Sequence, residues 1–355
     1  MTRALGTSAN ASYDFAMQVF ERQGSAGADL LEAAKRRCET QELHIVFPEG
    51  DDDRIRRAAA QLLERYPSVR VTLLAGDSGV HEALRRSYPT QRLAIINPEN
   101  APLAEEMASV YTSVRPDTAE AIARRVARKP LYLSGLLLRS GLVDAMVAGV
   151  TCPTARVIEA AMLTLGLGQG IAVPSSYFIM QPTGPQSAPF LFADCAVNIS
   201  PTADELAAIG VASARSWHAL TGAQPRVAFL SFSTHGSANH PEARRIREAA
   251  KLAATQCPGF HFEGELQADA ALCPRVASIK TRSAGEVAGQ ANVLVFPDLN
   301  AANIGYKLVQ QFGGARALGP FLQGFTRPVS DLSRGATVEE IVDTALLTAS
   351  QATLH

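Results

Sequence analysis

One candidate for ligand binding is the hydroxyl-rich segment FSTHGSAN at positions 232–239. It follows the apolar run RVAFLS and precedes a helical pattern that opens with Pro241, a favoured first residue of a helix. Backbone N–H groups and the positive end of a helix dipole attract anions at such a place. An ordinary turn between a strand and a helix, with residues that cap the helix, explains the same residues equally well. The residues that would hold an anion are Ser233, Thr234, Gly236 and Ser237.

A second candidate, DLNAANIGYK at 298–307, also follows an apolar run. Asp298 or Asn300 is suited to cap a helix there. Asn303, Tyr306 and Lys307 place further polar groups just past the strand, and Lys307 would supply a positive charge to a phosphate.

The third candidate is DLSRG at 331–335, which precedes the helical pattern TVEEIVDTALLTA. Thr337 and Glu340 fit the S/T-x-x-E capping box, which explains that acid structurally. Arg334 stands beside Gly335 at the expected helix start, where its planar fork of donors suits a phosphate or a developing oxyanion.

Metal and nucleotide chemistry find little support in the sequence. The acidic turn PEGDDD at 48–53 lacks the alternating spacing of a calcium loop, so capping of the next helix by these aspartates is preferred. His235 and His240 have no third ligand in view, so no metal site is expected. Neither the GKS or GKT ending of a P-loop nor a GxSxG elbow accompanies the candidates. The five scattered cysteines suit reduced thiols.

The three candidate loops must be positioned by the strands that precede them. Short apolar runs alternate with longer helical patterns, which predicts an α/β fold with mainly parallel sheets covered by helices on both faces. Ligands bind at the carboxyl ends of such strands. Leu206, Ile209, Trp217 and Leu220 form one apolar helical face, and Ile122 with Val126 predicts another. The segment 182–189 is either a long hairpin or a linker.

Length and composition limit the classes of function. The 355 residues suggest two domains, and 33 basic against 34 acidic side chains give a net charge of −1, so no nucleic-acid surface is expected. No apolar run reaches the roughly 20 residues of a membrane span, and the first residues lack a signal core. We therefore expect a cytoplasmic protein without a membrane partner.

Eight segments of the chain carry a resemblance to a known family: FPEGDDDRIRRAA, GLVDAMVAGV, SSYFIM, FADCAV, AFLSFSTHGSA, EGELQADAA, ANVLVFPDLNAANIGYK and GPFLQGFTRPVSDLSRG. Through them the chain, from about residue 30 onward, resembles the phosphate acetyltransferase family. The resemblance implies a two-domain fold like that of isocitrate and isopropylmalate dehydrogenases, with the active site in the interdomain cleft and a homodimer as the assembly. Domain I would comprise 1–167 and 323–355, and the inserted domain II 168–322.

The family reaction is acyl-CoA plus phosphate giving acyl phosphate plus CoA, by direct transfer without metal or cofactor. Acetyl-CoA or another short acyl-CoA and phosphate would be the ligands, in acetate metabolism. By position, Ser333 and Arg334 match the family's active-site serine and arginine, and Glu340 stands where many members have an aspartate for the thiol proton.

Two family arginines are missing from their places in this chain. Glu159 stands at the first place, with Arg156 one helical turn earlier, and Arg115 lies near the second. A non-catalytic acyl-CoA sensor of the same family is therefore an alternative. A nicotinamide-dependent dehydrogenase lacks its GxGxxG fingerprint. A covalent route through Cys152 lacks an evident activating group, and a solvated helix face accounts for Arg124, Arg125, Arg128 and Lys129.

Overall fold

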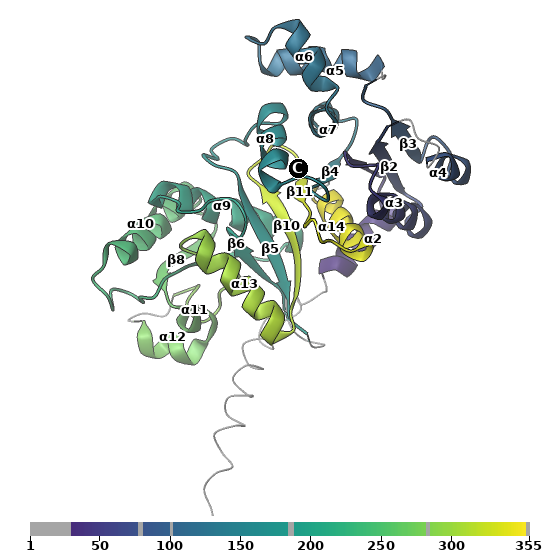
Figure 1. The fold of residues 1–355 in the computed structure, drawn as a ribbon. Coiled ribbons are helices and arrows are strands. Elements are labelled where there is room, and N and C mark those ends of the chain that lie inside the picture. The colour runs from purple at the N-terminus through teal and green to yellow at the C-terminus, as the bar shows by residue number, and fades with distance from the viewer. Residues whose placement is uncertain (1–29, 77–80, 100–101, 184–187, 282–284, 353–355) are drawn as a thin grey trace, which may run out of the picture. The chain divides into compact units, whose positions relative to one another are not determined.

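A computed structural model describes residues 30–76, 81–99, 102–183, 188–281 and 285–352 (Figure 1). The chain divides into two compact units. We call Leu31–Tyr177 together with Leu318–His355 the first unit, and Phe178–Ala317 the inserted unit. The sequence placed the insert at 168–322, whereas the divisions between these units fall inside two strands, β5 (Ser175–Gln181) and β10 (Arg316–Gln323).

The sheet of the first unit has the strand order β3-β2-β1-β4-β11-β10. Only the β10–β11 pair is antiparallel among these neighbours; the others are parallel, as the apolar runs predicted. The chain moves outward from β1 to β2 and β3 and then returns to the other side of β1 at β4, so the strand order reverses between β1 and β4. The other strands are β1 (Leu43–Phe47), β2 (Val69–Leu74), β3 (Leu93–Ile96), β4 (Ala145–Ala148) and β11 (Val329–Asp331).

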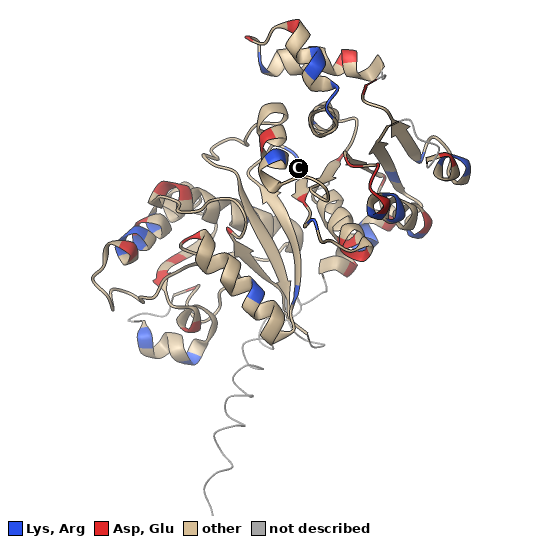
Figure 2. Ribbon diagram, viewed as in Figure 1, with Lys and Arg blue, Asp and Glu red and all other residues tan. Residues whose placement is uncertain are grey.

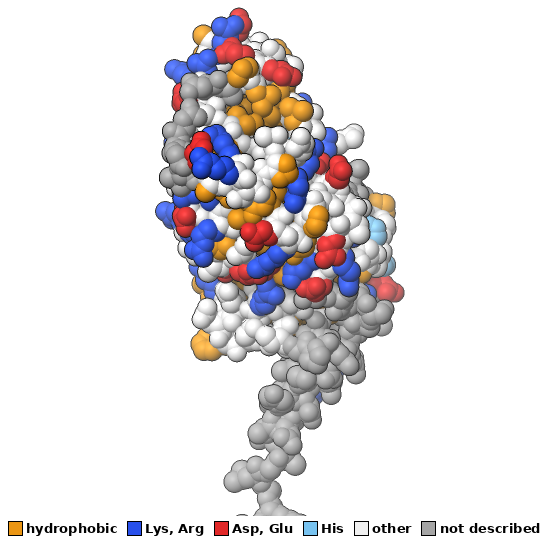
Figure 3. Space-filling view, turned by 90° about the vertical axis from the view of Figure 1, so that its right-hand side faces the viewer, with side chains coloured by type: hydrophobic (Ala, Val, Ile, Leu, Met, Phe, Trp, Pro, Cys, Tyr) orange, Lys and Arg blue, Asp and Glu red, His pale blue; other side chains and the backbone are white. Residues whose placement is uncertain are grey.

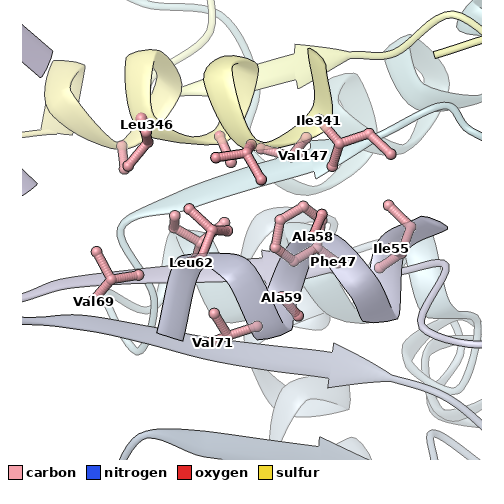
Figure 4. Close-up of a cluster of buried hydrophobic side chains, with 14 of the residues drawn as sticks. Phe47, Ile55, Ala58, Ala59, Leu62, Val69, Val71, Val147, Ile341 and Leu346 are labelled. Atoms are coloured by element: carbon pink, nitrogen blue, oxygen red, sulfur yellow. The ribbon is translucent and has the colours of Figure 1, made fainter. Parts of the chain in front are cut away.

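Helices cover both faces of β4 in this unit. On one face, α3 and α14 face each other across a cluster of buried apolar side chains that includes Phe47, Leu62 and Ile341 (Figure 4). On the other face, α7 packs on β4 and on α8. The helices are α2 (Leu30–Thr40), α3 (Asp53–Arg65), α4 (Glu82–Ser87), α5 (Pro102–Val114), α6 (Glu120–Ala127), α7 (Pro130–Arg139), α8 (Thr154–Thr164) and α14 (Val338–Gln351).

The apolar stripe predicted for α6 is wrong. Ile122 is 45% exposed, and the buried residues of this helix are Ala123 and Ala127. The helix turns its small side chains inward, because alanines let it approach α5 and α7 closely, and leaves the larger Ile122 outside.

The inserted unit holds the second half of β5 and the strands that follow, in the order β5-β6-β9-β7-β8. The pairs β6–β9, β9–β7 and β7–β8 are parallel. Neighbouring strands β5 and β6 flank the segment 182–189, of which residues 184–187 lie outside the described chain. The elements are β6 (Phe190–Ala193), β7 (Arg226–Leu230), β8 (His261–Leu266), β9 (Val293–Val295), α9 (Ala203–Thr221), α10 (Pro241–Gln256), α11 (Ala268–Leu272), α12 (Pro274–Lys280) and α13 (Leu299–Gly313).

In this unit α9 and α10 pack on each other and on the strands, and α9 buries the whole predicted apolar face, including Trp217. A separate apolar cluster joins α11, α12 and α13 to alternate residues of β5 and β6, such as Phe178 and Phe192. The prediction of a sheet covered by helices on both faces is confirmed.

Charged side chains lie mainly on helices and loops, while most strands carry none (Figure 2). On the face shown in Figure 3, basic and acidic side chains alternate without a large region of one sign. This distribution agrees with the net charge of −1 and offers no polyanion-binding surface on that face. Among the described residues, no helix is both long and apolar enough to span a membrane.

Candidate active site

A pocket of about 520 Å³ opens in the first unit at the carboxyl ends of β1 and β4, where the strand order reverses. The first turns of α7 and α8 border it, so two positive helix ends lie beside it. Lys129 and Arg156 add cationic side chains, and Tyr132 adds an aromatic ring. The lining residues are Pro48, Glu49, Asp51, Asp52, Lys129, Pro130, Leu131, Tyr132, Thr151, Cys152 and Arg156.

Glu49, which follows β1, organises the loop between β4 and α8. Its Oε2 accepts hydrogen bonds from the backbone N–H groups of Gly149 (2.7 Å) and Val150 (2.9 Å). Its Oε1 accepts from the N–H groups of Thr151 (2.7 Å) and Cys152 (3.1 Å) and from the Thr151 hydroxyl (2.6 Å). One carboxylate therefore satisfies four consecutive N–H groups, and the loop is fixed before any ligand arrives. The sequence analysis missed this role.

The DLSRG segment lies at the end of β11 in the same unit, and its Ser333 and Arg334 are exposed. Among the described residues, no acidic side chain pairs with the Arg334 guanidinium, so its donors are available to a ligand. Ser333 Oγ accepts a hydrogen bond from the Gly335 N–H (3.2 Å), which turns the chain toward α14.

Arg54 of α3 binds this segment through the segment's backbone carbonyl oxygens, a role that no sequence pattern indicated. Its guanidinium donates to the backbone carbonyl oxygens of Arg334 (2.7 Å), Ala336 (3.3 Å) and Val150 (3.2 Å). It also binds both carboxylate oxygens of Asp52 (3.1 and 2.9 Å), and the hydrogen bond from Arg54 lowers the pKa of Asp52. Asp52 in addition caps α3, as predicted. Arg54 thereby ties two loops of the site together.

Glu340 forms the predicted capping box at the start of α14. Its Oε2 accepts from the Thr337 N–H (2.8 Å) and hydroxyl (3.0 Å), and the Glu340 N–H donates to Thr337 Oγ1 (3.3 Å). Its Oε1 has no hydrogen-bond partner among the described residues. Glu340 is exposed, so one oxygen can meet a ligand while the other caps the helix.

The two places where family arginines were missing differ in their surroundings. Glu159 pairs with Arg156 on α8 (3.0 Å), so the carboxylate is matched by a cation that lines the pocket. Arg115 donates to the Met162 carbonyl in the last turn of α8 (3.2 Å) and does not line the pocket.

The Cys152 thiol lies in the pocket but is poorly suited to act as a nucleophile. Burial first, and then the nearby charge of Glu49, raise its pKa to about 12. The thiol therefore stays protonated at neutral pH, and the covalent route through Cys152 finds no support here.

Two of the four basic residues singled out at 124–129, Arg124 and Arg128, are paired as a solvated face predicts, whereas Lys129 lines the pocket of about 520 Å³. Arg124 pairs with Glu105 (3.1 Å) and Glu120 (2.5 Å), and Arg128 pairs with Glu105 (2.7 Å). These pairs lie at the surface around a second pocket of about 620 Å³.

In the inserted unit, a carboxylate of the chain itself fills the loop at 232–239. Buried Glu265 accepts from the Gly236 N–H (2.7 Å) and from the Ser233 hydroxyl (3.0 Å). Arg247 binds both of its oxygens (2.8 and 2.9 Å). Burial raises the pKa of Glu265, but the hydrogen bonds from Arg247 and from this loop outweigh it and lower the value to about 2. Glu265 therefore remains an anion at neutral pH.

The other predicted donors of that loop are also engaged within it. Thr234 Oγ1 accepts from the Gln267 N–H (2.9 Å), and Ser237 Oγ accepts from the Thr234 N–H (3.1 Å). Ser233 and Thr234 are buried, whereas Gly236 and Ser237 are exposed. These hydrogen bonds fix the loop, and of its four predicted anion-binding residues Gly236 and Ser237 are the exposed ones.

Of the candidate residues on α13, some side chains contact the rest of the chain and one is exposed to solvent. Asp298 caps the helix by accepting from the Ala301 N–H (2.9 Å), which confirms one of the two predicted caps. Asn303 donates to the Cys195 carbonyl (3.4 Å), and the Tyr306 ring stacks on Phe178 (4.4 Å between centroids). The exposed Lys307 ammonium lies 5.8 Å from the Tyr306 ring centroid.

The predicted site residues thus form two groups. Ser333, Arg334 and Glu340 belong to the first unit, and Ser233, Thr234, Gly236, Ser237, Asn303, Tyr306 and Lys307 belong to the inserted unit. Among the described residues, no group of three or more His, Cys, Asp or Glu side chains is arranged to hold a metal ion.

Comparison with known proteins gives consistent matches along the chain. The sequence model of the family described as Phosphate acetyl/butaryl transferase matches residues 29–349. The phosphate acetyltransferase of Thermoanaerobacterium thermosaccharolyticum is 37% identical over 328 residues, which cover 91% of this chain and 99% of that protein. The EutD phosphotransacetylase from Staphylococcus aureus has a similar structure, with a TM-score of 0.83 and 35% identity over 91% of this chain and 98% of that one. A phosphotransacetylase from Streptococcus pyogenes has a TM-score of 0.84 and 38% identity over the same shares.

Proposed function

Because this chain belongs to the Phosphate acetyl/butaryl transferase family, we propose that it transfers an acetyl group between coenzyme A and inorganic phosphate. The observation that carries the proposal is the exposed Arg334 guanidinium in the DLSRG segment, beside Ser333 and without an acidic partner among the described residues. Transfer to phosphate develops negative charge on the thioester oxygen, and a fixed guanidinium is suited to stabilise it.

In this proposal an oxygen of phosphate attacks the thioester carbon directly. The C–O bond forms, the tetrahedral intermediate collapses, and the C–S bond breaks to give acetyl phosphate and the CoA thiolate. Arg334 stabilises the oxyanion, and Ser333 donates a hydrogen bond to the thioester region. Glu340 takes up the proton that the phosphate loses as acetyl phosphate forms and passes it to the thiolate, which leaves as the CoA thiol. The high pKa of Cys152 supports direct transfer over an acyl-cysteine intermediate.

We further propose that coenzyme A, which is a substrate and not a cofactor, enters the pocket of about 520 Å³ in the first unit. Its phosphates would meet Lys129, Arg156 and the N-terminal ends of α7 and α8. Because Glu159 neutralises Arg156, we expect a lower affinity for CoA than an unpaired arginine at that position would give. No metal or other cofactor takes part in this mechanism.

The inserted unit would contribute the phosphate and acyl contacts that the sequence suggested. The exposed Lys307 and the edge of the loop formed by Gly236 and Ser237 support this role. Ser233, Thr234, Asn303 and Tyr306 would act by supporting these groups, since their polar atoms or rings already contact the chain.

From the family resemblance we also propose that the units correspond to the two domains of an isocitrate dehydrogenase-like fold with the active site in the cleft, and that the enzyme is a cytoplasmic homodimer of acetate metabolism. An apolar stripe on α13 supports the homodimer: Ile304, Leu308 and Phe312 are 58%, 49% and 87% exposed at helical spacing.

The proposed function is tested by phosphate-dependent release of the free CoA thiol from acetyl-, propanoyl- and butanoyl-CoA. We expect turnover with a preference for acetyl-CoA. Arg334→Ala should raise the barrier by about 2–4 kcal/mol, the range for loss of one oxyanion-stabilising group. Binding of CoA without turnover of any of the three thioesters would contradict the proposal and identify an acyl-CoA sensor.

A further inference from the structure

Asp331 is a buried carboxyl directly beneath the active-site segment. It ends β11, two residues before Ser333, and is only 2% exposed. One oxygen, Oδ2, accepts a short hydrogen bond from the hydroxyl of Thr154, the first residue of α8. Asp331 therefore connects the DLSRG segment to the helix that borders the pocket.

The second oxygen of Asp331 is unusual. Oδ1 is buried and has no hydrogen-bond partner among the described residues. It packs against Gly149, where a Cβ atom would come within 2.2 Å of it and where φ is +112°. Only glycine suits that position. A buried carboxylate in a protein core normally has both oxygens satisfied, so this arrangement disfavours a permanent charge.

The charged neighbours of Asp331 act in the same direction. Glu49 approaches from the loop after β1 and repels a second negative charge, and the Cys152 thiol of the loop before α8 is neutral. Arg54 of α3 binds Asp52 and three backbone carbonyl oxygens and not Asp331. Burial and the charge of Glu49 raise the pKa of Asp331 from 3.8 to about 7, although the hydrogen bond from Thr154 opposes the rise.

We propose that Asp331 is a positioning residue, which as a carboxylate ties the Ser333–Arg334 segment to the first turn of α8 through Thr154 and releases it on taking up a proton. A carboxylate accepts hydrogen bonds more strongly than the neutral acid does. The inference rests on the proposed function and adds a pH-dependent control to the same site.

The sign of the effect on activity follows. Below about pH 7 Asp331 holds its proton and the tie is weak; above that pH it is ionised and the tie is strong. We expect kcat to rise with pH through about 7 while the KM for acetyl-CoA changes little, because the tie orients Ser333 and Arg334 and does not itself contact the substrate.

Two variants test this assignment in the full-length protein. Asp331→Asn keeps the shape and one acceptor oxygen for Thr154 but cannot titrate, so the rise in kcat near pH 7 should disappear. Thr154→Val removes the tie itself, so kcat above pH 7 should fall on the order of tenfold, as for one hydrogen bond to a charged group, and should no longer rise near pH 7. Thr154→Ser retains the hydroxyl and should restore the wild-type profile.

A second measurement does not depend on turnover. The unfolded chain releases the Asp331 proton near its ordinary pKa of 3.8, whereas the folded chain keeps it to about pH 7. The wild type should therefore lose stability relative to Asp331→Asn as the pH rises from about 4 to about 7. Urea unfolding of both proteins across that range measures the difference.

The outcomes separate this inference from the proposed function. An active Asp331→Asn variant that keeps the kinetic rise near pH 7, or parallel stability curves for the two proteins, would overturn the role of Asp331 and leave phosphate-dependent turnover intact. The Arg334→Ala comparison tests that turnover at a single pH. Its failure would contradict the proposed reaction even if the stability curves differ.

Discussion

In three loops that follow strands, a carboxylate of the chain itself accepts hydrogen bonds from the backbone N–H groups of the loop. Glu49 satisfies the loop between β4 and α8, Glu265 satisfies the loop at 232–239, and Asp194 at the end of β6 accepts from the N–H groups of Ala196 (3.2 Å), Val197 (3.3 Å) and Asn198 (2.8 Å). Such loops bind external anions in many proteins. Here the built-in anions fix the shape of the loops, so we expect a ligand anion to be held by side chains such as Arg334 and by the first turns of α7 and α8.

Arg54 is the side chain whose conservative replacement should be most revealing. Arg54→Lys keeps the charge but loses the fork that joins Asp52 to three carbonyl oxygens, so we expect lower kcat and a free energy of unfolding reduced by about 1.5–3 kcal/mol, as for one hydrogen bond to a charged group. Enzyme assays and urea unfolding measure the two effects. The exposed Arg57 on the same helix provides the control, since Arg57→Lys should change neither. Equal behaviour of the two variants would contradict the role of Arg54.

Within the described residues, capping boxes begin two helices, and one of them adjoins the proposed active site. Thr337 with Glu340 starts α14, and Thr202 with Glu205 starts α9 in the inserted unit. The first box fixes the end of the DLSRG segment and holds one oxygen of Glu340, whereas the second lies in an element to which no catalytic role is assigned.

The two boxes provide a matched pair of variants. Thr337→Ala and Thr202→Ala should each destabilise the protein by about 1 kcal/mol, the usual effect of losing such a cap. Only Thr337→Ala should also lower turnover, because it frees Glu340 and the chain after Arg334. Thermal unfolding and the CoA-release assay measure both. An equal loss of activity in the two variants would mean that the cap of α14 acts through stability alone.

The sequence correctly predicted features that depend on residues close to one another along the chain. The apolar face of α9, the cap at Asp52 and the box at Thr337 all depend on short spacings, which fix local geometry. Contacts distant along the chain were missed. Glu49 and Gly149 are 100 residues apart, and Arg54 and Arg334 are 280 apart. The engagement of the loop at 232–239 by Glu265 was also missed, because a hydroxyl-rich loop looks alike whether its anion is a ligand or a side chain.

We expect the proposed dimer to form through the exposed apolar stripe on α13, which comprises Ile304, Leu308 and Phe312. Phe312→Glu should convert the proposed dimer to a monomer, because it places a charge on the 87% exposed Phe312 side chain. Ile279→Glu on α12 is the control, since Ile279 is 75% exposed but lies off the stripe, and it should leave the dimer intact. Light scattering after size-exclusion chromatography measures the mass. A dimeric Phe312→Glu variant would exclude α13 from the interface.

The chain passes from the first unit to the inserted unit within β5 and returns within β10. This arrangement bears on how the protein could have evolved. The two segments of the first unit end on neighbouring strands, where the Tyr177 and Phe321 rings stack at 5.2 Å between centroids. Residues 178–317 therefore enter and leave at one place in that sheet. An insertion of these residues into an ancestral chain would therefore lengthen two existing strands and leave the order β3-β2-β1-β4-β11-β10 of the first unit unchanged.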